Sequence, residues 1–269
     1  MSGSDPAGNY RFVFVSGSWD ATGGRALGAR LLIDDVRTQS AAANLFTGTN
    51  CNPCTVTGNE INFNGSVSLG ANAVIANTGA SAITGNITGT GSLSKAGSGT
   101  LTLSGNNSYT GGTHINAGVL ALNHANALGT VGSVQFGGGI LQHGPNNSTD
   151  YSARFVASGN QAIRIDTNGR EITYGTALAG ANTSLEKLGA GSLVLTANGS
   201  YTGATTITGG SLVLRHNAPT RATSGFAGPG TLVIEPSGAS FTSTFNTTGW
   251  NFNARSEEHT SELQSRHNV

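Results

Sequence analysis

A segment of 30 residues that occurs twice constrains the fold of this chain more than any other feature. Residues 93–122 align with residues 185–214 without a gap, and 16 of the 30 aligned positions are identical. The two lysines of the chain, Lys95 and Lys187, occupy the same repeat position. A repeat of this kind predicts structural units that stack on their neighbours and share one continuous core.

Within each copy, apolar residues stand at every second position of short runs such as LTL and LVL. A period of two places alternate side chains on the same face of a β-strand. The runs are separated by Gly, Asn and Ser, which suit tight corners because they tolerate positive φ angles or bond to the backbone. The residues expected to form the repeat core are Leu101, Leu103, Ile115, Leu120 and Leu122 in the first copy and Leu193, Leu195, Ile207, Leu212 and Leu214 in the second.

The distance between equivalent strands predicts how the chain closes on itself. Leu101 and Leu120 are 19 residues apart, as are Leu193 and Leu212. A return after this distance fits one coil of a parallel β-helix, an all-β solenoid, with about 19–22 residues in each coil. An antiparallel sandwich or barrel also combines short strands with Gly-rich turns, and it is the alternative.

The same rhythm of short strands and Gly/Asn corners extends beyond the two copies. We expect strands in the runs SVQF, GILQH, ARFV, AIRID and EITYG between the copies, and a decayed third copy at residues 228–238. Residues 25–44 read either as a helix or as a coil whose strand is LLI. The β-helix is therefore expected over residues 25–254, preceded by an edge or frayed segment at residues 1–24.

The end of the chain differs in character from the rest. Residues 255–269, RSEEHTSELQSRHNV, are rich in charge and contain neither glycine nor a strand pattern. The run RSEEHTSELQS resembles, residue by residue, the translation of a widely used short-read sequencing adapter. We therefore expect a non-native tail over these residues and interpret the chain as a fragment of a longer protein.

Composition and charge argue against several classes of protein. The formal net charge is zero and no basic stripe is present, which disfavours a nucleic-acid-binding protein. No apolar stretch reaches the length of about 18 residues that a transmembrane helix needs. The start MSGSDPAGNYRFVFV lacks the basic region and the long apolar run of a signal peptide.

The repeat resembles the passenger-associated strand repeat of bacterial autotransporters. The resemblance rests on K-x-G-x-G-x-L-x-L, then N-x-S-Y-T-G-x-T-x-I, then G-x-L-x-L, which stand here as KAGSGTLTLSGNNSYTGGTHINAGVLAL and KLGAGSLVLTANGSYTGATTITGGSLVL. It implies a right-handed parallel β-helical passenger that is secreted or displayed at the bacterial outer membrane. The implied partners are a C-terminal outer-membrane β-barrel of the same protein and a host or glycan surface ligand. Export by a separate partner protein is the other route.

This resemblance carries over no catalytic residue and no cofactor. It therefore predicts a non-enzymatic stalk or adhesin-like passenger. The alternative is a β-helical enzyme that cleaves polysaccharides, since such enzymes need carboxylates clustered on one face. The densest charged group, Arg164, Asp166, Arg170 and Glu171, is a weak candidate for that site. A structural role is favoured because no second cluster completes a site.

Two cysteines, Cys51 and Cys54, stand in the run CNPC. A redox pair is expected next to a βαβ pattern, which the sequence does not show. We therefore expect a small local disulfide at a corner, or two idle thiols. The histidines lack the spacing of metal ligands, so no metal site is expected.

Overall fold

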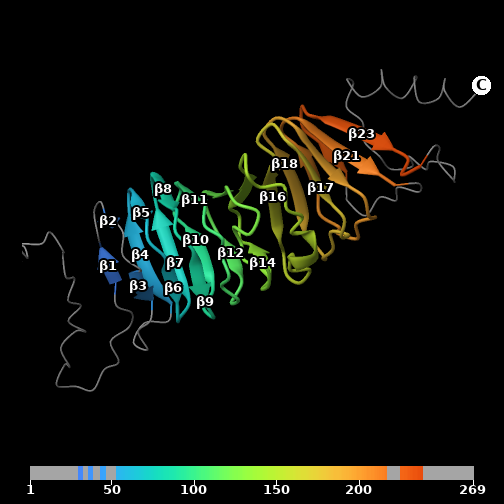
Figure 1. Ribbon diagram of the computed structural model, residues 1–269. Coiled ribbons are helices and arrows are strands. Elements are labelled where there is room, and N and C mark those ends of the chain that lie inside the picture. Colours follow the sequence, from blue (N-terminus) through green and yellow to red (C-terminus); the bar gives the residue numbers. More distant parts are fainter. Residues whose placement is uncertain (1–29, 33–35, 39–42, 47–52, 217–224, 239–269) are drawn as a thin grey trace, which may run out of the picture.

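The computed structural model describes residues 30–32, 36–38, 43–46, 53–216 and 225–238. In these residues the chain forms 23 β-strands and one 3-10 turn, Ser152–Arg154 (η1), and it contains no α-helix. Every described strand pairs in parallel with its neighbours, for example Leu101 with Leu120 and Leu193 with Leu212. Figure 1 shows the strands following one another along an elongated stack from β1 to β23. The predicted parallel β-helix is confirmed, and the antiparallel alternative is wrong.

Four sheets run along the stack. The six-stranded sheet contains β1 (Arg30–Leu32), β4 (Cys54–Gly58), β7 (Ala73–Asn77), β10 (Leu93–Ala96), β12 (Thr113–Ile115) and β14 (Val134–Phe136). The three-stranded sheet contains β3 (Ala43–Phe46), β6 (Val67–Leu69) and β9 (Ile87–Gly89). Together with the longest sheet, these two form the faces of the first coils.

The longest sheet has ten strands and spans the described stack. Its members are β2 (Val36–Thr38), β5 (Ile61–Phe63), β8 (Ala80–Ile83), β11 (Thr100–Leu103), β13 (Val119–Leu122), β15 (Ile140–His143), β16 (Ala162–Asp166), β18 (Ser184–Leu188), β20 (Thr205–Ile207) and β22 (Phe226–Ala227). The four-stranded sheet contains β17 (Glu171–Tyr174), β19 (Ser192–Leu195), β21 (Ser211–Arg215) and β23 (Thr231–Glu235).

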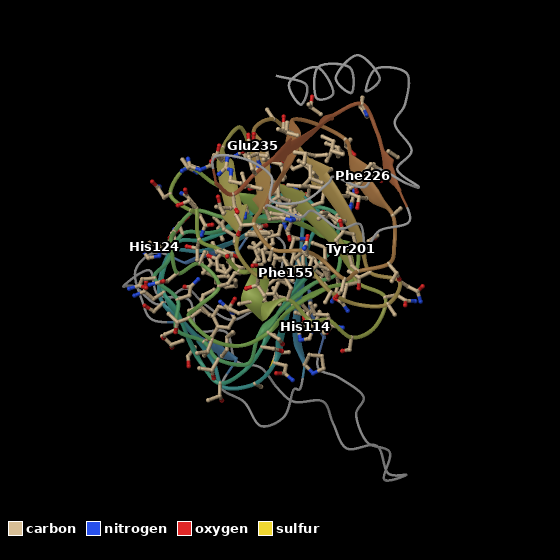
Figure 2. The ribbon with its side chains drawn as sticks, turned by 90° about the vertical axis from the view of Figure 1, so that its right-hand side faces the viewer. His114, His124, Phe155, Tyr201, Phe226 and Glu235 are labelled. Carbon is tan, nitrogen blue, oxygen red and sulfur yellow. The ribbon has the colours of Figure 1, made fainter. Side chains whose placement is uncertain are left out.

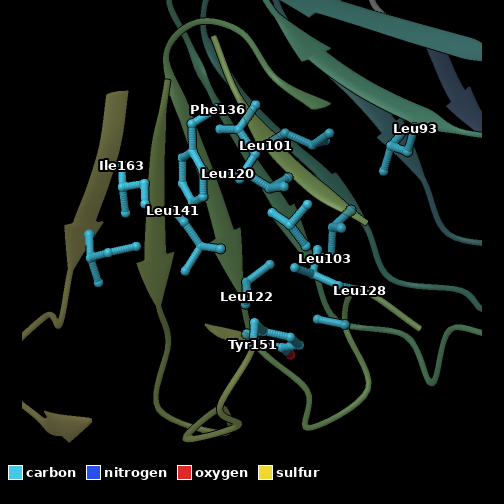
Figure 3. Close-up of a cluster of buried hydrophobic side chains, with 14 of the residues drawn as sticks. Leu93, Leu101, Leu103, Leu120, Leu122, Leu128, Phe136, Leu141, Tyr151 and Ile163 are labelled. Carbon is cyan, nitrogen blue, oxygen red and sulfur yellow. The ribbon is translucent and has the colours of Figure 1, made fainter. Parts of the chain in front are cut away.

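A continuous apolar column fills the inside of the coils. Alternate residues of each strand point inward, and Figure 3 shows Leu101, Leu120 and Leu141 from three successive coils packed together. Burying one such side chain stabilises the fold by about 1.5–3 kcal/mol. The ten repeat leucines and isoleucines are all buried: Leu101, Leu103, Ile115, Leu120, Leu122, Leu193, Leu195, Ile207, Leu212 and Leu214.

Tight corners let the coils stack at strand spacing. Gly85 lies over Gly65, and a Cβ atom on Gly85 would come within 2.1 Å of the Gly65 carbonyl oxygen. Gly105 lies over Gly85 in the same way, at 2.2 Å. A side chain at such a corner would push the coils apart, so glycine is required there by space.

The structure corrects one expected strand and decides one ambiguous segment. The run ARFV does not form a strand, because Ser152–Arg154 is a 3-10 turn and only Phe155 bridges to Val134. Residues 30–32 form β1, so the strand interpretation of that segment is confirmed. The edge segment at residues 1–24 and the tail at residues 255–269 lie outside the described residues.

The two copies of the repeat lie on different faces of the stack. The column of Leu101 passes through Leu120, Leu141 and Ile165 and reaches Lys187, which precedes Leu193 by six residues. As a result β10 belongs to the six-stranded sheet, whereas its repeat equivalent β18 belongs to the ten-stranded one. The extra length lies in residues 144–161, which we call the junction. The first stack, β1–β15, and the second stack, β16–β23, meet there one face out of phase.

Candidate functional site

Each repeat copy buries a lysine at a corner. Lys95 follows the inward face of β10, and its Nζ donates to the carbonyl oxygens of Ala96, Gly97 and Ala117 at 2.6, 2.8 and 3.2 Å. Its side chain has no exposed area. Burial lowers the pKa of Lys95 to about 8. The ammonium has three protons and the corner offers three carbonyls, so the charged form is fully hydrogen-bonded.

The second copy repeats this arrangement at the same distances. Nζ of Lys187 donates to the carbonyl oxygens of Leu188, Gly189 and Gly209 at 2.6, 2.8 and 3.2 Å. Burial also lowers the pKa of this lysine to about 8, and Asp166 opposes the shift weakly. We call each set of three carbonyls a lysine cage. Sequence reasoning noted that the lysines share a repeat position but assigned them no role. Their identity in a chain with no other lysine was the available signal.

A buried tyrosine closes the long corner of each copy. The hydroxyl of Tyr109 lies 2.7 Å from Oγ1 of Thr113, and that of Tyr201 lies 2.7 Å from Oγ1 of Thr205. Burial raises the pKa of both tyrosines above the usual value of about 10. In Figure 2, which looks along the stack, Tyr201 lies nearer the centre whereas His114 lies at the rim. These rings serve packing and offer no exposed face to a ligand.

An arginine ties the junction to the coil before it. Arg154 Nε donates to the Gly132 carbonyl at 2.6 Å, and its two Nη atoms donate to the carbonyls of Leu128, Gly129 and Val131. Its guanidinium carbon lies 5.7 Å from the ring centre of Tyr151. This fork of donors holds the preceding corner without a carboxylate partner.

The weak enzymatic candidate does not form one cluster. Arg164 pairs with Glu186, Nε to Oε2 at 2.6 Å, and the two side chains are about one-third exposed. Asp166 accepts from Gln142 Nε2 and from the Asn168 backbone N–H. Glu171 faces Arg215 at 3.9 Å. In the described part of the chain, no hydrogen bond or ion pair joins Arg164 or Asp166 to Arg170 or Glu171.

The proposed disulfide falls at the limit of the described residues. Cys54 begins β4 and is buried, whereas Cys51 lies outside the described residues. The Cys51–Cys54 disulfide therefore stays a prediction.

Two further searches concern the described residues alone. They contain no group of three or more His, Cys, Asp or Glu residues placed to hold a metal ion. Nor does any helix within them have the length and apolar character to cross a membrane.

Comparisons with known proteins agree with the repeat. The passenger-associated-transport-repeat family matches residues 93–122 and 185–214. The adhesin BmaC autotransporter of Brucella suis biovar 1 (strain 1330) is 37% identical to this chain over 134 residues. That match covers 49% of this chain and 4% of the length of the relative. No solved structure matches the chain. The resemblance to autotransporter passengers is thereby confirmed.

Proposed function

We propose that the chain is a non-enzymatic β-helical stalk within an adhesin-like autotransporter passenger at the cell surface or outside the cell. The observation that carries this proposal is the content of the repeat. Its kept residues are inward leucines, corner glycines, a caged lysine and a buried tyrosine, and each of them stabilises a coil. A unit kept for coil stability is what a rod requires.

The surface of the first stack supports a binding role that does not depend on charge. Between residues 53 and 149 the charged side chains are Glu60 and Lys95, and Lys95 is buried in its cage. The outward positions carry mainly Thr, Ser, Asn and Ala. Such a surface can offer many hydrogen bonds and little electrostatic steering. It suits a neutral surface ligand, such as a host or bacterial glycan.

The export partner belongs to the same proposal. An autotransporter passenger is paired with an outer-membrane β-barrel of its own chain, and we propose such a barrel as the partner here. Two-partner secretion, with the barrel on a separate protein, is the competing route. Sequencing the source locus with long reads distinguishes them, because a barrel-coding segment in the same reading frame supports the first and its absence supports the second. The same reads test whether residues 255–269 are adapter-derived.

Surface display is tested by protease treatment of intact cells that express the complete gene. An antibody against residues 53–216 should detect a product that proteinase K removes without lysis. A periplasmic control protein should survive the same treatment. Protection of the passenger until the cells are opened would refute surface display.

The enzymatic alternative is tested on a panel of polysaccharides. We expect no cleavage by the purified chain, and no difference between the wild type, Asp166→Asn and the matched surface control Glu60→Gln. Cleavage that disappears only in Asp166→Asn, with unchanged folding, would replace the stalk proposal by an enzymatic one.

A further inference from the structure

A buried polar cluster links the two stacks at the junction. His143 ends β15 in the first stack, and Tyr174 ends β17 in the second. The imidazole Nδ1 lies 2.8 Å from Oδ1 of Asn147, and Nε2 lies 3.0 Å from the Tyr174 hydroxyl. The side chains of His143, Asn147 and Tyr174 are at most 1% exposed. The histidine is therefore a direct polar contact between elements on both sides of the phase change.

The partners of Asn147 define where the protons lie. Its amide nitrogen donates to the His124 carbonyl at 2.6 Å and to the Tyr151 hydroxyl at 2.7 Å. Its Oδ1 therefore faces His143 and can only accept, so Nδ1 of the imidazole carries the proton. Nε2 of a neutral ring then accepts from the Tyr174 hydroxyl. The Tyr151 hydroxyl donates onward to the Ala125 carbonyl at 3.0 Å. With neutral His143, each of these groups has a suitable partner.

A second proton on His143 breaks this arrangement. Nε2 would become a donor and turn the Tyr174 hydroxyl into an acceptor. The hydroxyl proton would then have no acceptor, since the structure shows no other partner for this hydroxyl among the described residues. The new charge would also be buried without a carboxylate in contact.

The charged groups around the cluster oppose each other. Burial lowers the pKa of His143 to about 4, Arg170 lowers it further, and Asn147 and Asp166 act against the shift. Tyr151 and Tyr174 stay neutral because burial raises the pKa of each. Asp150 lies close enough to Tyr174 to raise the pKa of that hydroxyl, yet it bonds to the backbone N–H groups of Ser152 and Gly175 and leaves the ring of His143 unpaired.

Apolar contacts at the junction are few and edge-on. Phe155 bridges the stacks, with its ring 5.0 Å from Phe136 on one side and 5.5 Å from Tyr174 on the other, both in T-shaped geometry. Each aromatic pair contributes about 0.5–1.5 kcal/mol beyond its area burial. The polar cluster is therefore a substantial part of what holds the two stacks in register.

We propose that His143 makes the junction an acid-sensitive joint, whose protonation releases Tyr174 and uncouples the second stack from the first. Because protonation is favoured only in the opened form, each pH unit below the usual histidine pKa of about 6.5 increases the opening constant about tenfold. The increase ends near the native pKa of about 4. The opening constant therefore grows by roughly two to three orders of magnitude over this range.

Hydrogen exchange of the full chain, followed by mass spectrometry between pH 7 and pH 4, tests this joint. After correction for the intrinsic effect of pH on exchange, peptides that contain residues 140–176 should open far more at low pH than peptides from β4–β9. His143→Gln removes the titrating group and should abolish this difference. His114→Gln, at a partly exposed position on β12, is the matched control and should leave the wild-type response unchanged. An equal acid response in wild type and His143→Gln would overturn the proposal.

A second measurement does not depend on the folding of that variant. Direct titration of His143 by NMR in the wild-type chain should give a pKa well below 6.5, accompanied by a change in the Tyr174 ring signals. Tyr174→Phe removes the donor to Nε2 and should raise that pKa, an effect that lost packing alone does not produce. A titration near 6.5 in the wild type would also overturn the proposal.

Discussion

At the scale of single residues, this solenoid uses cations to satisfy carbonyl groups that its corners turn inward. Lys95 and Lys187 each bind three carbonyls, and the partly buried Arg154 binds four. A buried carbonyl without a donor costs about 1–3 kcal/mol. One long basic side chain can satisfy several carbonyls at once. The charge is held by dipoles, because no acidic side chain forms an ion pair with either lysine.

Replacing one caged lysine tests this interpretation. Lys95→Met keeps an apolar stem of similar length and removes the three N–H donors. We expect it to lower the free energy of unfolding by about 1–3 kcal/mol in urea titrations, since the lost bonds outweigh the relief from burying a charge. Lys187→Met should have the same effect because the two cages match in distance. Arg215→Met, on the outer face of β21, should change stability little; equal effects at all three positions would contradict the cage.

The caged lysines also predict how stability varies in alkaline solution. Burial lowers the native pKa of both lysines to about 8, below the model value of 10.5. Between these values the unfolded chain binds more protons than the native chain, so stability rises with pH, by at most about 1.4 kcal/mol per unit for each lysine. Unfolding midpoints at pH 8, 9 and 10 should increase in the wild type. A Lys95→Met/Lys187→Met double variant should show no such increase.

The sequence predicted the apolar half of each coil better than its polar half. Leu101 and Leu120 could be placed because period two and a 19-residue return each constrain them independently. The burial of Lys95 could not be derived in this way, because an isolated lysine at a strand end is ordinarily solvated. Its partners are backbone carbonyls, which no residue type reveals.

At the scale of elements, the corners set how closely coils can stack. We expect Gly85→Ala to destabilise the chain by more than about 2 kcal/mol, since its Cβ would lie 2.1 Å from the Gly65 carbonyl oxygen. Gly238→Ala is the matched control, because no atom lies within 4 Å of the added carbon. Thermal unfolding of both variants measures the difference. A similar melting temperature for the two variants would show that the corner can relax.

The phase change between the stacks predicts which strands can be cross-linked. Gln142 in β15 is the register partner of Asp166 in β16. If the two copies instead stacked on one face, Gln142 would lie beside Thr173 in β17. Under mild oxidation, Gln142→Cys/Asp166→Cys should therefore form a disulfide, and Gln142→Cys/Thr173→Cys should not. Peptide mapping identifies the bond, and the reverse result would refute the phase change.

This phase change was beyond the sequence pattern. The repeat offset suggested a whole number of coils, but the coils between the copies vary, from 19 residues at Leu101–Leu120 to 24 at Leu141–Ile165. The run ARFV has a strand-like composition. In the structure Arg154 instead turns back to bind the corner at residues 128–132, which favours a 3-10 turn. Local pattern could not predict that long-range contact.

At the scale of the whole molecule, the stack separates two tasks. Its interior holds the caged lysines, the tyrosine–threonine pairs and the junction cluster. Its outer faces carry short hydroxyl and amide side chains, with the described charged residues concentrated in the second stack: Arg164, Asp166, Arg170, Glu171, Glu186, Arg215 and Glu235. Most of these pair with one another across neighbouring coils, as Arg164 does with Glu186 and Arg215 with Glu235. Stability and recognition can therefore change independently along the rod.

This distribution of charge makes a prediction for the adhesion that we propose. Exposed charge on residues 53–149 is limited to Glu60, so binding through the first stack has no large electrostatic contribution for salt to screen. Attachment of the displayed passenger to a glycan-coated surface should therefore change less than about threefold between roughly 0.05 and 0.5 M NaCl. Glu60→Gln should bind as the wild type does at both salt concentrations. A steep loss of attachment with salt would place the binding surface on the charged second stack or outside this chain, and Glu186→Gln combined with Arg164→Gln would then decide between these two locations.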